Sequence, residues 1–145
     1  MRLSIILMLA VSMALISSVF AQVSVKLTVT GFHNNEGRLL LAVFNNLSQF
    51  PYEPFIEFAW EKDTVSGSSM IIDFDLPAEG SYAFSVLDDK NSNGEMDKNF
   101  IGLPQEHFGF SNNARPVIFS PPEFEDCLVK ILPGINDLEI ILQRY

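Results

Sequence analysis

The sequence is poor in cysteine and in basic residues, and each shortage excludes a class of protein. Its 145 residues include one cysteine, Cys127, so no intramolecular disulfide can form. Nine Lys and Arg residues are outnumbered by 18 Asp and Glu residues, which gives a formal net charge of -9. Nucleic-acid phosphates are bound by clustered positive charge, so we expect no nucleic-acid partner.

The sequence also lacks the short motifs of common hydrolases and zinc sites. It contains no Gly-x-Ser-x-Gly, no His-Glu-x-x-His and no Cys/His pattern with zinc spacing. We therefore expect a protein that is not an enzyme. The alternative is a metal-assisted or carboxylate-based hydrolase that uses Asp88, Glu106 or His107.

A long apolar run occurs only near the start of the chain. Arg2 precedes a nearly uninterrupted apolar segment, and Val19 and Ala21 occupy the -3 and -1 positions before Gln22. This order is typical of a secretory signal peptide over residues 1–21. A transmembrane anchor is the alternative, because the uncharged stretch is about the minimum length for a span. We expect cleavage, export to the periplasm or the extracellular space, and no membrane span after cleavage.

Residues 22–145 have the length of one domain and read as short strands separated by turns. Apolar and polar residues alternate in Val23–Thr30, as in a strand that is buried on one face. The candidate strands are residues 23–30, 38–44, 56–65, 69–76, 82–86, 116–120, 127–132 and 135–143, with one helical turn at 47–49. The pattern predicts an all-β fold: a single antiparallel β-sandwich of seven to eight strands, immunoglobulin-like or transthyretin-like, with one long ordered loop over residues 88–115.

The 88–115 loop contains a spacing that is typical of a calcium site. Oxygen-bearing side chains stand at relative positions 1, 3, 5 and 9 of the segment 89–97, and glycine stands at position 6. This matches the first nine places of an EF-hand-type loop, in which alternate side chains converge on one ion. The predicted ligands are Asp89, Asn91, Asn93, the backbone carbonyl of Glu95, and Asp97. Hard oxygen ligands favour Ca²⁺ over zinc or copper.

The match to an EF-hand is incomplete. Position 12 is Phe100 instead of a bidentate glutamate, so a further ligand must come from Asp88, Glu106 or water. Two carboxylates within the motif predict weak binding, with a Kd of about 10⁻⁴–10⁻³ M. The alternative is a turn rich in Asn, Asp and Gly that holds no metal.

The whole run from Asp89 to Arg115 supports a more specific comparison. It reads Asp-x-Asn-x-Asn-Gly-x-x-Asp-x-Asn-Phe-x-Gly-x-Pro-x-Glu-x-x-Gly-Phe-Ser-Asn-Asn-Ala-Arg. Together with Ala42–Asn45, Phe50-Pro51 and Pro122–Asp126, it resembles the hallmark of a family of small secreted bacterial proteins catalogued as domain of unknown function 2141. The resemblance implies a secreted β-sandwich and transfers no catalytic residue.

Aromatic residues form the other conspicuous surplus. Phe50, Tyr52, Phe55 and Trp60 lie near one turn-rich segment, and three phenylalanines punctuate the long loop. We expect most of them to form a satellite core that pins the loop onto the sandwich. An exposed aromatic surface for a glycan or a protein partner is the alternative. We therefore expect a non-catalytic binding module whose partner and oligomeric state the sequence does not encode.

Overall fold

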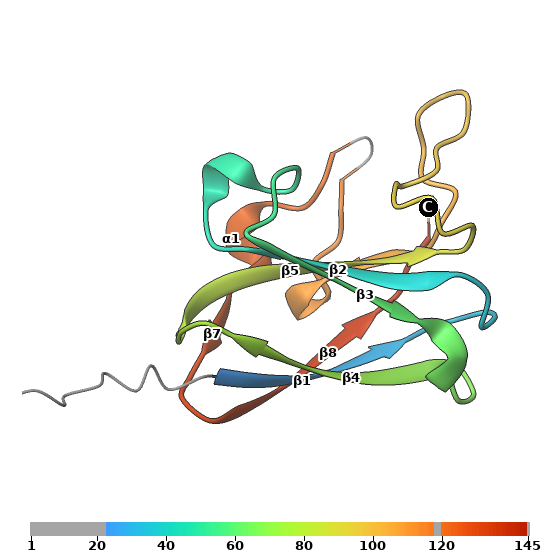
Figure 1. Ribbon diagram of the computed structural model, residues 1–145. Helices are drawn as coiled ribbons and strands as arrows, with labels where there is room; N and C mark the ends of the chain where they lie inside the picture. The colour runs from blue at the N-terminus through green and yellow to red at the C-terminus, as the bar shows by residue number, and fades with distance from the viewer. Residues whose placement is uncertain (1–22, 118–119, 145) are drawn as a thin grey trace, which may run out of the picture.

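The computed structural model describes residues 23–117 and 120–144, and it shows two β-sheets packed face to face (Figure 1). The predicted signal peptide lies outside the described residues. The eight strands are β1 (Val23–Thr30), β2 (Arg38–Phe44), β3 (Ile56–Glu61), β4 (Ser69–Leu76), β5 (Gly80–Asp89), β6 (Phe108–Phe110), β7 (Val129–Ile131) and β8 (Ile135–Ile141). The helical segments are η1 (Leu47–Gln49), η2 (Lys62–Thr64), η3 (Ser111–Asn113) and α1 (Phe124–Cys127). In the described ranges, none of these helical segments is long and apolar enough to cross a membrane.

The smaller sheet has the strand order β4-β1-β8. The alternation in β1 is confirmed: its odd-numbered residues are buried, while Ser24, Lys26, Thr28 and Thr30 point away from the sandwich. β1 pairs antiparallel with β4, but it pairs parallel with β8, with Leu27 opposite Leu138. The predicted all-antiparallel arrangement is therefore correct for every named strand pair except this one.

The larger sheet has the order β3-β2-β5-β6, and the short β7 pairs with the first residues of β5. β2 and β5 are its central strands and are antiparallel, with Arg38 opposite Asp89 and Phe44 opposite Ala83. Gly109 in β6 is required by close packing, since a Cβ there would lie 2.5 Å from Cγ2 of Ile140 and 2.9 Å from the carbonyl oxygen of Ile141.

The core fills the space between the two sheets. Inward side chains of β1, β4 and β8 meet those of β2, β3 and β5 in one cluster of buried aliphatic and aromatic residues. Phe74 bridges the sheets, because its ring lies 5.1 Å from the Phe58 ring and 6.2 Å from the Phe84 ring, measured between centroids. The sandwich fold is thus the one that the strand pattern predicted.

Several predicted elements differ in the structure: β5 runs over Gly80–Asp89 instead of 82–86, β8 ends at Ile141 instead of residue 143, and β6 lies inside the predicted loop 88–115. β3 ends at Glu61, because η2 follows and turns the side chain of Lys62 inward. The predicted strand 127–132 is reduced to β7, because Cys127 closes the short helix α1. The predicted strand 116–120 includes two residues outside the described ranges, and its ends, Val117 and Ser120, form an isolated bridge.

Candidate functional site

The last two residues of β5 project to opposite faces of the larger sheet. Phe84, Val86 and Asp88 share the inner face, and Ser85, Leu87 and Asp89 share the outer face, because side chains alternate along a strand. The loop therefore begins two residues later than the predicted start at residue 88, and it returns to the sheet at His107, whose carbonyl accepts the N–H of Asp88 at 2.9 Å. The carboxylates of Asp88 and Asp89 are adjacent in sequence but therefore lie on opposite faces of the sheet.

Asp89 anchors the start of the loop. It is fully buried, and its carboxylate accepts the backbone N–H of Asn93 at 3.1 Å and of Gly94 at 2.9 Å. The guanidinium of Arg38 lies 3.6 Å from the same carboxylate and donates to the carbonyl of Ser92 at 2.8 Å. The carboxylate of Asp89, the first predicted ligand, is therefore held in place by backbone N–H groups of the loop and by Arg38.

The other motif side chains converge around Asp97. Its two oxygens accept the side-chain amides of Asn91 at 2.8 Å and Asn93 at 2.9 Å. The amide oxygen of Asn91 accepts the N–H of Asn93, and that of Asn93 accepts the N–H of Glu95 at 2.8 Å. The structure thus brings Asp89, Asn91, Asn93 and Asp97 together, and Glu95 joins them through its backbone.

Gly94 serves the loop through its backbone conformation. Its φ of +83° lies in the left-handed region, which side chains rarely adopt. A Cβ at this position would meet nothing within 4 Å, so space alone does not exclude a side chain here. The restriction is one of dihedral angle.

Glu106 closes the loop from outside the nonapeptide. It is buried, and its oxygens accept the backbone N–H of Lys90 at 2.9 Å and of Asp97 at 3.1 Å. One carboxylate thereby ties both ends of the segment 90–97 together. Each of its oxygens keeps a second lone pair, so these bonds leave acceptor capacity.

Asp88, the other candidate for an additional ligand, is committed elsewhere. Both it and Lys62 are fully buried, and the Lys62 ammonium lies 2.5 Å from its Oδ1 and 3.2 Å from the amide oxygen of Asn34. The Oδ2 atom of Asp88 is buried and has no hydrogen-bond partner among the described residues. Asp88 thus belongs to an ion pair on the inner face of the sheet.

His107 packs beside this ion pair. Its ring stacks on that of His33, with the ring centroids 4.4 Å apart. His33 is exposed, as expected for a residue in a turn. Burial lowers the pKa of His107, and the positive charges of His33 and Lys90 add to this effect. The histidine is therefore held toward its neutral form.

The acidic residues alone do not define a metal centre. No group of three or more His, Cys, Asp or Glu side chains is arranged to hold a metal ion in residues 23–117 and 120–144. The oxygen-bearing side chains gathered in the loop are two motif carboxylates, two amide groups and the nearby Glu106. Such a set suits a hard cation and requires the amide oxygens as ligands.

Of the seven aromatic residues considered for a satellite core, Trp60 packs against the main core instead, and only Phe50, Phe108 and Phe110 take part in a satellite core on the outer face of the larger sheet. It contains Phe44, Ala83, Phe108, Phe110, Phe124 and Cys127, and Phe50 packs against it. The Phe50 ring lies 5.1 Å from that of Phe44 and 5.5 Å from that of Phe124. Tyr52 and Phe100, by contrast, are 82% and 99% exposed.

Cys127 lies inside this satellite core and is fully buried. Burial, together with the nearby Asp126 charge, raises the pKa of its thiol to about 12. Its carbonyl accepts the hydroxyl of Ser111, which itself accepts the N–H of Phe84 at 2.9 Å. The thiol is thus held in its unreactive protonated form, as a buried structural cysteine is expected to be.

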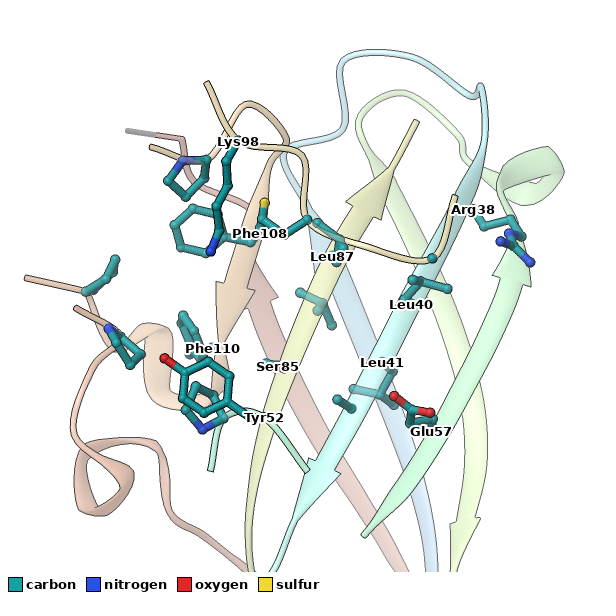
Figure 2. Close-up of a pocket in the computed structure, with 18 of the residues that line it drawn as sticks. Arg38, Leu40, Leu41, Tyr52, Glu57, Ser85, Leu87, Lys98, Phe108 and Phe110 are labelled. Atoms are coloured by element: carbon teal, nitrogen blue, oxygen red, sulfur yellow. The ribbon is translucent and has the colours of Figure 1, made fainter. Parts of the chain in front are cut away.

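A cleft that the sequence did not reveal lies between the loop and the satellite core (Figure 2). Its volume is about 780 Å³, and its floor is the outer face of β2, β3 and β5. The floor residues include Leu40, Ala42, Ser85 and Leu87. The only sequence feature that could have indicated the cleft is the continuous apolar run of β2. A central strand buried on both faces gives the same run. Arg38 was missed as well, because its pairing with Asp89 follows from strand register alone.

Comparison with known proteins identifies the family of the chain. Neither the curated proteins nor the solved structures include a significant match to this sequence. A family model does match residues 27–137, which span the sandwich from β1 into β8 and include the whole loop. The chain belongs to the family described as "Uncharacterized protein conserved in bacteria (DUF2141)".

Proposed function

We propose that the protein is an exported, non-catalytic β-sandwich module in which Ca²⁺ orders the loop after β5 for binding a partner or ligand. The observation that carries the proposal is the convergence of Asp89, Asn91, Asn93 and Asp97 within one hydrogen-bonded loop that Glu106 closes. Of the two candidates for an additional ligand, Glu106 is favoured, since Asp88 faces the other side of β5.

The ion would act by preorganisation. Asp97 and Glu106 meet at the same backbone segment, and like charges at close range disfavour the ordered loop. Arg38 lies near Asp89, and its ion pair offsets only part of this repulsion. A bound divalent cation would offset the remainder and would replace the amide-to-Asp97 hydrogen bonds with metal ligation by the amide oxygens.

A titration with thermal melts tests the calcium proposal. With a Kd of about 10⁻⁴ M, Ca²⁺ at a hundredfold excess over Kd stabilises the fold by about 2.7 kcal/mol. We expect a Tm rise of several degrees, which Asp97→Asn and Asp89→Ala abolish. Glu95→Gln is the matched control, because it removes one loop charge from an exposed side chain and leaves the backbone carbonyl in place. A wild-type Tm that Ca²⁺ does not change would overturn the proposal.

Export is tested separately. The mature protein should begin at Gln22, which mass spectrometry of the purified periplasmic or secreted fraction can establish. A product that retains residues 1–21 and sediments with membranes would favour the anchor instead. Export and weak calcium affinity are consistent with each other, because calcium modules outside cells bind in the range of about 10⁻⁴–10⁻³ M.

The hydrolase alternative draws less support from the geometry. Both oxygens of Glu106 accept backbone N–H groups, and Asp88 is paired with Lys62 on the opposite face of β5. His107 stacks on His33, and its buried Nδ1 has no partner within the described residues. These groups are occupied in holding the fold, so they do not converge on a shared reacting atom.

A further inference from the structure

The outer face of the larger sheet is unusual for a sandwich. Residues on the outer face of an antiparallel sheet are normally polar, and β1 in the smaller sheet follows this rule with Ser24, Lys26 and Thr28. β2 presents Leu40 and Ala42 at the corresponding outward positions, and β5 presents Leu87. An apolar outward face that neither the loop nor the satellite core covers completely needs an occupant.

We propose that this cleft binds a small amphipathic molecule with an apolar chain and an anionic head group. The proposal deepens the proposed function, since the calcium-type loop forms one wall of the cleft. Its volume of about 780 Å³ falls within the range of about 300–1,000 Å³ that is typical of small-molecule sites.

The walls are as apolar as the floor. Met96, Leu103 and Pro104 of the long loop line the cleft, and so do Pro116 and Pro121. Phe108 and Phe110 of β6 also line it (Figure 2). A ligand chain that fills this space would remove aliphatic and aromatic surface from water, which favours binding.

The charges give the cleft a direction. Lys98 and Arg38 lie toward its loop end, while Glu57 and Tyr52 lie toward the opposite end (Figure 2). Arg38 is already engaged by Asp89 and Ser92, but Lys98 is exposed, and no carboxylate of the described chain pairs with its ammonium. In a chain with a net charge of -9, an uncompensated lysine at the mouth of an apolar cleft favours an anion at that point.

Other occupants fit less well. A peptide strand would add to a free sheet edge, which β3 offers only at the rim of the cleft floor; the middle of the floor is the face of β2 and β5, whose backbone groups are paired on both sides. A glycan needs a flat aromatic platform and many hydrogen-bonding groups, whereas Leu40, Ala42 and Leu87 make this floor aliphatic.

Three eight-carbon probes test the assignment: octyl sulfate, octanol and octyltrimethylammonium, each below the concentration at which it forms micelles. We expect calorimetry and amide chemical shifts to show octyl sulfate binding to the cleft, with octanol weaker and the cation weakest. Lys98→Gln should weaken octyl sulfate about 2- to 5-fold, as expected for an exposed charge pair, and leave octanol unchanged. Lys90→Gln, in the same loop but outside the cleft, should change neither.

A second variant tests the place of binding. Ser85→Phe fills the centre of the floor and should abolish binding of octyl sulfate and octanol. Thr28→Phe, at an outward position of β1, is the matched control and should bind normally. Binding that survives Ser85→Phe, or a folded wild type that binds oligosaccharides or peptides but not octyl sulfate, would overturn the proposal.

The titrations are run once with Ca²⁺ and once with EDTA. This separates failure of the calcium proposal from failure of the cleft proposal. Octyl sulfate binding without any Ca²⁺-dependent Tm shift would retain the cleft and refute the calcium loop. A Tm shift without octyl sulfate binding in either buffer would retain the calcium loop and refute the cleft.

Discussion

The inner and outer faces of β2 and β5 use the same two strands in different ways. On the inner face, Leu39, Leu41 and Val43 are at most 1% exposed and pack against the opposing sheet. On the outer face, Leu40 and Ala42 are half-buried and border the cleft. Both faces are apolar, but only the inner one has a partner sheet.

The two faces also end differently. The inner face ends in Asp88, which is paired with Lys62 inside the protein, and the outer face ends in Asp89, which opens the loop. A buried ion pair contributes to a fixed interior, whereas a carboxylate that holds loop N–H groups shapes a surface. The comparison indicates that the inner face determines the fold, whereas the outer face carries the cleft for which we propose a ligand.

The largest effect should come from breaking the inner ion pair. Lys62→Met leaves the Asp88 carboxylate buried without its cation, which should lower the free energy of unfolding by about 3–5 kcal/mol. Urea denaturation measures this loss. The double variant Lys62→Met/Asp88→Leu should recover most of it, because no charge then remains buried. If Lys62→Met is as stable as the wild type, the ion pair does not contribute to the stability of the fold.

The next effect compares the two faces within one strand. Leu41→Ala should cost about 2–5 kcal/mol, because it leaves a cavity between the sheets. Leu40→Ala, its neighbour on the cleft side, should cost about 1 kcal/mol, since water already reaches this side chain. Urea denaturation of both variants measures the two losses in free energy of unfolding. Equal losses would contradict the distinction between the packed inner face and the open outer face.

The smallest effect concerns the satellite core that covers the far end of the outer face. With a thiol pKa of about 12, Cys127 should not react with iodoacetamide at pH 8 in the native protein and should react fully in urea. Because the folded pKa is raised above the unfolded value, the stabilisation is complete below about pH 9 and is lost as the pH rises toward 12. Cys127→Ala should remove this alkaline loss, and rapid alkylation of the native protein would show that the satellite core is open to water.

The sequence predicted those features that depend on neighbouring residues. Period-two alternation located β1 and the middle of β5, and the continuous apolar run located β2 at the centre of its sheet. The loop motif placed Asp89, Asn91, Asn93 and Asp97 together, because alternate side chains of a tight turn converge.

The features that escaped prediction depend on strand register or tertiary packing. Arg38 meets Asp89, and Lys62 meets Asp88, only because strands far apart in sequence are brought side by side. In the sequence, the apolar residues on the outer face of β2 look the same as residues buried in a core. The cleft could therefore not be predicted from the sequence.

The parallel pairing of β1 with β8 has a consequence for how the protein reaches its native state. Asn136, near the start of β8, donates to the carbonyl of Ser24 across 112 positions of sequence. β1, the central strand of the smaller sheet, therefore keeps one edge unpaired until β8 has been synthesised. Contacts of such long range slow folding, so the smaller sheet should be completed only after β8 has joined β1.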